Sequence, residues 1–516
     1  MAALTRFVLG TGLPCLLATF ATPASAAPAL VIDTTIAVVS SDGSDTLVAR
    51  RLILPARVRA AAYDSAGRVL LISYEGERYP GSGITEETMG PPSLLAYDLG
   101  NRRVLWKRKD RALPYGVIRG RGVLVEKNDA DVVDLADGKN LVHVNDDWYL
   151  DHADGLVVKA TDRSITAYDV ATGEIRWDAD RQGVTGEARF LRPRDVLLVA
   201  ADGLQALRIA TGEGWSYPLP ASRARVFALA GEQGFVRVPT LGSLLGLGGR
   251  QVESMNGLPV VEGGRVYFAA ETTVVCLGLE TGQLLWRREL RRDRRFSLMR
   301  RAMGLPSANE FLGNLLLRSS GGTLTVASLG WASGAKANWI ADKPTIALLA
   351  KEDGHVIRRV RVEGVEYLID VRSTPRGHFL LAPDRIVLMD DSLRVVHTFR
   401  STASVSLTSF FPCEDPIVVV AADGIEAFGP DSLRQIWQRK IGSVGAVWPG
   451  WGRPGADGYR WTISTAGLNA FDLRGGCQAV RSYPLQGVAS DIQDGAALVY
   501  SGRSLVLLPI PIRGAR

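Results

Sequence analysis

The sequence predicts an all-β protein whose 516 residues fold as a single β-propeller of four-stranded blades. A hairpin motif recurs along most of the chain, and most neighbouring copies lie roughly 35–42 residues apart, the length of one blade. No helical pattern of comparable length interrupts the motif. Glycine is also frequent, with 55 residues, as expected where many short strands are joined by tight turns.

The hairpin motif is clearest in residues 167–177 (AYDVATGEIRW) and 276–286 (CLGLETGQLLW). Two further copies, at 96–106 and 427–437, share with these a tryptophan eight residues after an Asp or Gly. A glycine in the turn adopts the left-handed conformation at low cost, and the second strand then ends in the tryptophan. We expect these side chains to pack between neighbouring blades; they are Trp106, Trp177, Trp286 and Trp437.

Degenerate copies keep the turn pattern without the aligned tryptophan, at residues 134–142, 208–216, 350–358, 389–397 and 472–480. With the four clear copies, the sequence contains nine hairpins. A strand ahead of the hairpin also recurs, because VAADG stands both at 199–203 and at 420–424. The two ends of the chain contain further segments that are able to pair with each other.

Residues 259–261, 264–267 and 279–286 resemble a known family, the pyrroloquinoline-quinone-type (PQQ-type) propeller repeats. Families with this repeat include the quinoprotein alcohol dehydrogenases and the propeller subunit of the outer-membrane β-barrel assembly machine. The chain resembles the second of these more. Both usually have eight blades, so the resemblance implies eight blades here, within a range of seven to ten.

The N-terminal residues 1–26 resemble an export signal. Arg6 is their only charged residue, an apolar stretch covers residues 7–20, and small residues precede a cleavage site after Ala26. An uncleaved anchor is the alternative. No later stretch reaches the ~18 consecutive apolar residues of a membrane helix. We therefore expect the propeller to occupy residues 27–516 and to be periplasmic or secreted, without a transmembrane segment.

Three cysteines remain after such a cleavage, so at most one internal disulfide can form. Cys276 lies in an apolar strand segment and is expected to remain a buried free thiol. Cys413 follows a proline and Cys477 follows two glycines, which are loop contexts. Cys413 and Cys477 are therefore the candidates for a disulfide.

The segment after Trp286 is basic, with eight arginines within fifteen residues against Glu289 and Asp293. These candidate partner-binding residues are Arg287, Arg288, Arg291, Arg292, Arg294, Arg295, Arg300 and Arg301. We predict insertions near 240–257 and 287–341 that emerge on the propeller rim and form the principal contact surface, because the repeat elsewhere keeps its period without this extra length. Long loops in compact folds are usually functional or disordered. Clustered arginines are better tolerated opposite an anionic partner. Two long loops with a solvated arginine face are the alternative.

No sequence motif predicts a catalytic, cofactor-binding or metal-binding residue. No two cysteines are adjacent, and the sequence lacks a Cys-x-x-Cys-His site, a Walker A loop and a Gly-x-Ser-x-Gly elbow. The net charge of +6 is mild for this length and does not imply nucleic acid. We predict a non-catalytic binding or scaffold protein that engages a protein or an anionic envelope component, including peripheral contact with a membrane. A quinone-dependent dehydrogenase, or another enzyme with an unrecognised site in the central channel, is the alternative.

Overall fold

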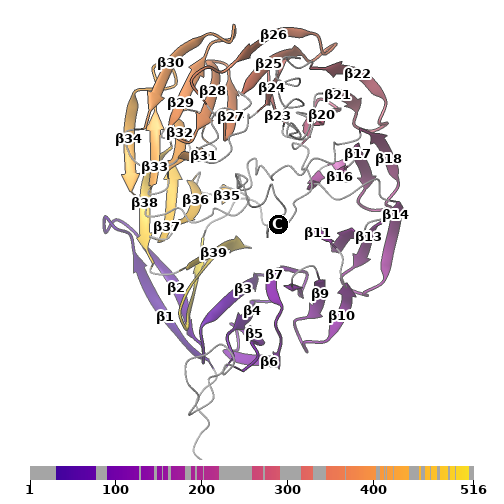
Figure 1. The fold of residues 1–516 in the computed structure, drawn as a ribbon. Coiled ribbons are helices and arrows are strands. Elements are labelled where there is room, and N and C mark those ends of the chain that lie inside the picture. Colours follow the sequence, from indigo (N-terminus) through magenta and orange to yellow (C-terminus); the bar gives the residue numbers. More distant parts are fainter. Residues whose placement is uncertain are drawn as a thin grey trace, which may run out of the picture.

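The computed structural model is a ring of small antiparallel β-sheets (Figure 1), so the prediction of an all-β propeller is confirmed. It describes residues 31–510 apart from the segments 77–89, 220–258, 291–314, 329–343 and 441–452 and shorter gaps of one to six residues. That part of the chain contains strands β1 to β41 and no α-helix. The predicted export signal, residues 1–26, lies outside the described residues.

In each of nine blades, four consecutive strands pair antiparallel, with the first strand nearest the centre of the ring and the fourth strand on the outside (Figure 1). Blades 1 to 5 consist of β3 (Val58–Asp64), β4 (Val69–Tyr74), β5 (Ser93–Asp98), β6 (Arg103–Lys109); β7 (Leu113–Ile118), β8 (Arg121–Glu126), β9 (Asp129–Asp134), β10 (Asn140–Val144); β11 (Trp148–Ala153), β12 (Leu156–Ala160), β13 (Ser164–Asp169), β14 (Ile175–Asp180); β15 (Glu187–Leu191), β16 (Val196–Ala201), β17 (Gly203–Arg208), β18 (Gly214–Pro218); and β19 (Val260–Glu262), β20 (Arg265–Ala270), β21 (Thr273–Gly278), β22 (Leu284–Glu289). Blades 6 to 9 consist of β23 (Leu315–Ser320), β24 (Thr323–Ser328), β25 (Thr345–Ala350), β26 (Val356–Arg361); β27 (Asp370–Thr374), β28 (Gly377–Ala382), β29 (Arg385–Met389), β30 (Val395–Arg400); β31 (Leu407–Phe411), β32 (Ile417–Ala421), β33 (Gly424–Phe428), β34 (Gln435–Lys440); and β35 (Arg453–Pro454), β36 (Tyr459–Ser464), β37 (Gly467–Asp472), β38 (Gln478–Pro484).

The tenth, closing blade combines the two ends of the chain in one five-stranded sheet. From the outside inward its strands are β1 (Ile32–Val39), β2 (Thr46–Ile53), β41 (Ser504–Pro509), β40 (Ala496–Ser501) and β39 (Val488–Gln493). β2 pairs antiparallel with β41, with Arg50 opposite Leu507 and Ile53 opposite Ser504. Backbone pairing between an early strand and a late strand therefore closes the ring.

The number of blades differs from the number that the family resemblance implied. The described residues form ten sheets, which lies within the predicted range of seven to ten blades and exceeds the eight that the resemblance implied. Each of the nine predicted hairpins is the third and fourth strand of one of blades 1 to 9, and the chain ends pair as the tenth. The hairpin count was therefore a better guide than the usual size of related propellers.

The hydrophobic core lies between neighbouring blades. Middle strands are buried on both faces, as in β4 and β33, where every residue is buried. One core cluster combines Leu198 and Leu204 of blade 4 with Phe268 and Leu277 of blade 5. The outermost strands are largely exposed, because no further strand or blade covers them. Continuous apolar runs thus mark the middle strands, whereas polar and charged residues accumulate on the outermost ones.

Tryptophans connect the fourth strand of one blade to the third-to-fourth-strand turn of the next. Three of the four predicted tryptophans donate through the indole Nε1 to a backbone carbonyl there, at 2.9 Å from Trp106 to Leu135, 2.7 Å from Trp177 to Ile209 and 2.9 Å from Trp286 to Lys351. The ring also lies against the glycine of that turn. At Gly354 a Cβ atom would stand 2.4 Å from the Trp286 ring, so only glycine fits.

Trp215 makes the same contact, which the sequence reasoning missed. Its Nε1 donates to the Leu279 carbonyl at 2.8 Å, and its ring lies against Gly282. In β14 and β22 a β-bulge inserts one residue before the tryptophan, which gives the spacing of eight. β17 and β18 pair without a bulge, so Trp215 comes only seven residues after Arg208.

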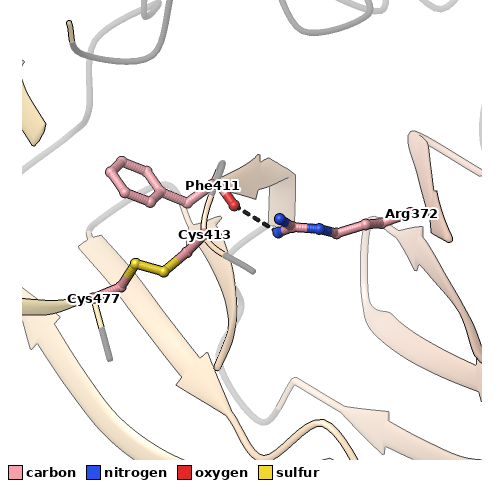
Figure 2. The surroundings of a disulfide bond; sticks show 4 residues. All are labelled: Arg372, Phe411, Cys413 and Cys477. Atoms are coloured by element: carbon pink, nitrogen blue, oxygen red, sulfur yellow. Dashed lines mark hydrogen bonds between the residues drawn. A yellow bond between two sulfur atoms is a disulfide. The ribbon is translucent and has the colours of Figure 1, made fainter. Parts of the chain in front are cut away.

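A disulfide joins blades 8 and 9 (Figure 2). Cys413, just after β31, is bonded to Cys477, just before β38, and their Cα atoms are 6.3 Å apart. Beside it, the rings of Phe411 and Phe471 pack with centroids 4.8 Å apart. The Arg372 guanidinium of blade 7 donates to the Phe411 carbonyl at 2.9 Å, as Figure 2 shows. Covalent, aromatic and polar contacts therefore meet at this joint.

Candidate functional site on the outer rim

The structure describes two of the eight predicted arginines. Arg287 and Arg288 lie on β22, where Arg287 is exposed and Arg288 is half-buried. The Nε atom of Arg288 donates to the Gly354 carbonyl of blade 6 at 2.8 Å. The other six lie outside the described residues: Arg291, Arg292, Arg294, Arg295, Arg300 and Arg301.

The structure corrects the second predicted insertion, residues 287–341. Residues 287–289 complete β22, and two further strands inside this range, β23 and β24, belong to blade 6. The prediction relied on the hairpin between third and fourth strands, and the first two strands of a blade carry no comparable signature. The other predicted insertion, 240–257, lies outside the described residues, as do 291–314 and 329–341.

The fourth strands of four consecutive blades, β22, β26, β30 and β34, follow one another around the circumference of the ring (Figure 1) and are called the basic rim here. Their cations are Arg287, Arg288, Arg358, Arg359, Arg361, Arg400, Arg439 and Lys440. Glu289 is the one acid within these four fully described strands. The basic character that the sequence indicated near Trp286 therefore continues over three more blades.

Exposed apolar side chains accompany these cations. Among the described residues, seven of the thirteen exposed large hydrophobic side chains lie on the basic rim: Leu284, Leu285, Val356, Ile357, Val395, Val396 and Ile436. Ile357 is 50% exposed and Ile436 is 55% exposed. Large exposed apolar groups gathered in one region mark interaction surfaces, whereas scattered single ones do not.

The β-bulges at the same place in each strand contain four of the seven exposed apolar residues. In β26, Arg358 pairs with Leu348 and Val356 pairs with Leu349, so Ile357 is left between two ladder positions. The equivalent shifts in β22, β30 and β34 leave out Leu285, Val396 and Ile436. A bulged residue re-aims its side chain relative to a regular strand. The repeat thus displays one apolar side chain at the same level of each blade.

Buried contacts hold blades 5 and 6, and with them β22 and β26, in fixed positions. Lys351 is 8% exposed, and its Nζ atom donates to Glu262 of β19 at 2.7 Å. This ammonium group, with a further hydrogen bond from Ser319, holds the pKa of Glu262 below its ordinary value. The Lys351 carbonyl in turn accepts the hydrogen bond from Trp286 on β22. The basic rim therefore lies on a rigid support.

Three other outermost strands, β6, β10 and β18, lack this combination of groups in their described residues. β10 and β18 contain no lysine or arginine. β6 has four cations but no exposed large apolar residue, and Arg108 there donates to Asp110 and Asn140. The Lys107 ammonium lies 5.6 Å from the centre of the Tyr74 ring. Position on the circumference alone therefore does not produce the basic and apolar surface.

A buried polar cluster joins blades 6 and 7. His378 of β28 is 3% exposed, and its Nδ1 atom lies 2.9 Å from Ser373 Oγ. Ser373 Oγ also lies 2.9 Å from Thr325 Oγ1 of β24. Loss of solvation lowers the pKa of His378 below its ordinary value, partly offset by Asp390 and Asp391. Because the three groups connect neighbouring blades, we interpret the cluster as an inter-blade contact.

Acidification should weaken the propeller through His378. A histidine with a lowered pKa stabilises the fold above its unfolded value of about 6.5, and this stabilisation is lost as the pH falls through the folded value. The melting temperature should therefore fall between about pH 7.5 and pH 5.5. His378→Asn, whose amide can still form a hydrogen bond with Ser373 but does not titrate, should flatten this dependence. An equally steep fall in the variant would show that another group is responsible.

Cys276 is free and buried, and loss of solvation raises the pKa of its thiol to about 11, which keeps it unreactive. The described residues include no cluster of three or more His, Cys, Asp or Glu side chains suited to a metal ion.

Among the described residues, no helix has the length and apolar character needed to cross a membrane.

Residues 93–239 match the model of a PQQ-type repeat family described as outer membrane protein assembly factor BamB. No curated protein matches the sequence significantly. Among solved structures, BamB from Moraxella catarrhalis is 13% identical over 73% of this chain and 96% of that chain, with a TM-score of 0.33. The Pan2 WD40 domain of Neurospora crassa is 9% identical over 64% and 90%, with a TM-score of 0.35. The family match and the repeats together show a PQQ-type β-propeller that resembles BamB.

Proposed function

We propose that this chain is an exported, non-catalytic scaffold or binding protein that engages a protein or envelope partner through the basic rim. The observation that carries the proposal is the rim itself, with eight cations, one acid and seven exposed apolar side chains on four neighbouring strands. Function in a propeller depends on the groups it displays on its rigid frame. The family description of BamB as an assembly factor is compatible with such a role.

The rigidity of the ring supports a scaffold role. The tryptophan contacts, the Lys351 to Glu262 pair and the disulfide each connect one blade to the next. A binding surface that is already ordered loses little conformational entropy when its partner arrives. The disulfide also suits export, because such bonds persist outside the cytoplasm.

Purification from the native envelope without overexpression tests the proposal. The wild-type chain should retain one partner in stoichiometric amount, and Arg358→Ser/Arg359→Ser/Arg361→Ser should lose it while keeping its melting temperature. The purified protein should also be titrated with PQQ and calcium and then assayed as a dye-linked dehydrogenase. Retention of the partner by the variant, or cofactor-dependent turnover, would refute the proposed function.

A further inference from the structure

We infer that the basic rim binds an acidic, extended polypeptide segment of a partner protein, with β26 as its principal contact. The inference rests on the proposed function, in which the rim is a binding surface, and adds the chemical class of the partner. The positive charge of β26 favours a negatively charged partner, because the strand carries three exposed arginines in six residues and no acid.

The spacing of the charges on β26 fits an extended chain. Arg359 and Arg361 are two residues apart, so both project from one face of the blade, about 6.6 Å from each other. A second extended chain repeats its side chains at the same interval. Acidic residues at alternate positions of such a segment would therefore lie opposite the guanidinium groups of Arg359 and Arg361 at the same time.

The apolar residues add a second contact in line with the charges. Val356 and Ile357 stand at the start of β26, 38% and 50% exposed, and the arginines follow. A segment that combines acids with one or two aliphatic residues thus matches the strand along its length. Removing these exposed aliphatic side chains from water would stabilise the complex.

The edge of the sheet offers a place for such a segment. β26 is the outermost of the four strands of its sheet, and extended peptides add to sheet edges as further strands. Its arginines oppose pairing with the equally basic rim of a second copy. The same charges favour pairing with an acidic strand, so the edge of the sheet selects acidic over basic partners.

A bilayer fits these observations less well than a polypeptide. The rim is the convex circumference of the ring (Figure 1), so a flat membrane would contact only part of it. The turns next to the apolar residues also expose acids: Glu280, Glu352, Asp353, Asp391 and Asp431. These carboxylates would repel an anionic bilayer from the apolar residues, whereas a single extended chain can follow the cations and avoid the turns.

Fluorescence anisotropy with a labelled ten-residue peptide of alternating Glu and Val tests the inference. The wild-type protein should bind it at low salt, and Arg358→Ser/Arg359→Ser/Arg361→Ser should weaken binding about tenfold, since exposed ion pairs contribute modestly. Arg103→Ser/Lys107→Ser/Lys109→Ser on β6 is the matched control and should leave binding nearly unchanged. Replacing the three β26 arginines by lysine should retain most of the affinity, and melting temperatures should confirm that all variants are folded.

Three outcomes overturn the inference in distinguishable ways. If the acidic peptide does not bind but phosphatidylglycerol vesicles do, and the β26 variant weakens that binding, the rim is a binding surface for lipid and only the partner class is wrong. If neither probe binds and the native partner is retained by the β26 variant, the proposed function also fails. Equal weakening by the β6 variant would show that net charge, not β26, governs binding.

Discussion

Replacing Trp286 by alanine should lower the free energy of unfolding by about 3–5 kcal/mol, as truncation of a large buried aromatic residue usually does. Trp286 is 7% exposed, donates to the Lys351 carbonyl and packs against Gly354 of the next blade. The change therefore removes core volume and a hydrogen bond between blades. Equilibrium urea unfolding, followed by intrinsic fluorescence of the remaining tryptophans, measures it.

Two glycines with nearly the same backbone conformation separate the packing effect from backbone strain. Gly354 has φ +70° and Gly43 has φ +71°, but a Cβ atom at Gly43 would meet nothing within 4 Å. Gly43→Ala should lower the free energy of unfolding by only about 1 kcal/mol, because alanine is strained in the left-handed conformation. Gly354→Ala must also displace the Trp286 ring and should cost more. Equal losses would show that the ring does not pack on Gly354.

Removal of the disulfide should be the second large effect. Cys413→Ala/Cys477→Ala removes a cross-link between residues 64 positions apart in the sequence. The chain-entropy model predicts that such a cross-link adds about 4 kcal/mol to the free energy of unfolding. Blade 9 should be affected most directly, because Cys477 stands immediately before β38, the outermost strand of that blade. The lower stability should appear in urea unfolding and in faster proteolysis near blade 9.

Cys276→Ala is the matched control for the disulfide, because it removes a buried sulfur without a cross-link. It should lose less stability than the double variant, and only the wild-type protein and this control should be destabilised by dithiothreitol. Mass mapping of peptides without reduction should identify a Cys413–Cys477 peptide pair. A bridge that includes Cys276 would contradict the structure.

The sequence could predict those parts of the fold that depend on patterns of residues close together in the chain. The turn and its two flanking strands lie within one hairpin, so all nine hairpins were recognisable, although only four carry the aligned tryptophan. β23 and β24 were not, because an alternating apolar strand looks alike in a blade and in a long loop. Trp215 was missed because β18 lacks the bulged residue, so the tryptophan stands one position earlier than in the motif.

The rim could be predicted only in part, for a different reason. Arg287 and Arg288 stood in a conspicuous run of arginines, but Arg359 and Arg439 are separated by whole blades in the sequence. Only the ring brings these strands together. Ile357 and Ile436 looked like ordinary strand residues, and their exposure depends on bulges that no composition reveals.

Photo-crosslinking in the native envelope tests the central claim most directly. A photoreactive residue at Val356 of β26 is compared with one at Ile175 of β14, which occupies the equivalent hairpin position and is also exposed. The account predicts a single crosslinked protein from Val356, joined through an acidic segment and lost in Arg359→Ser/Arg361→Ser. Crosslinking of the same partner from Ile175 with equal yield, or of lipid alone from Val356, would contradict it.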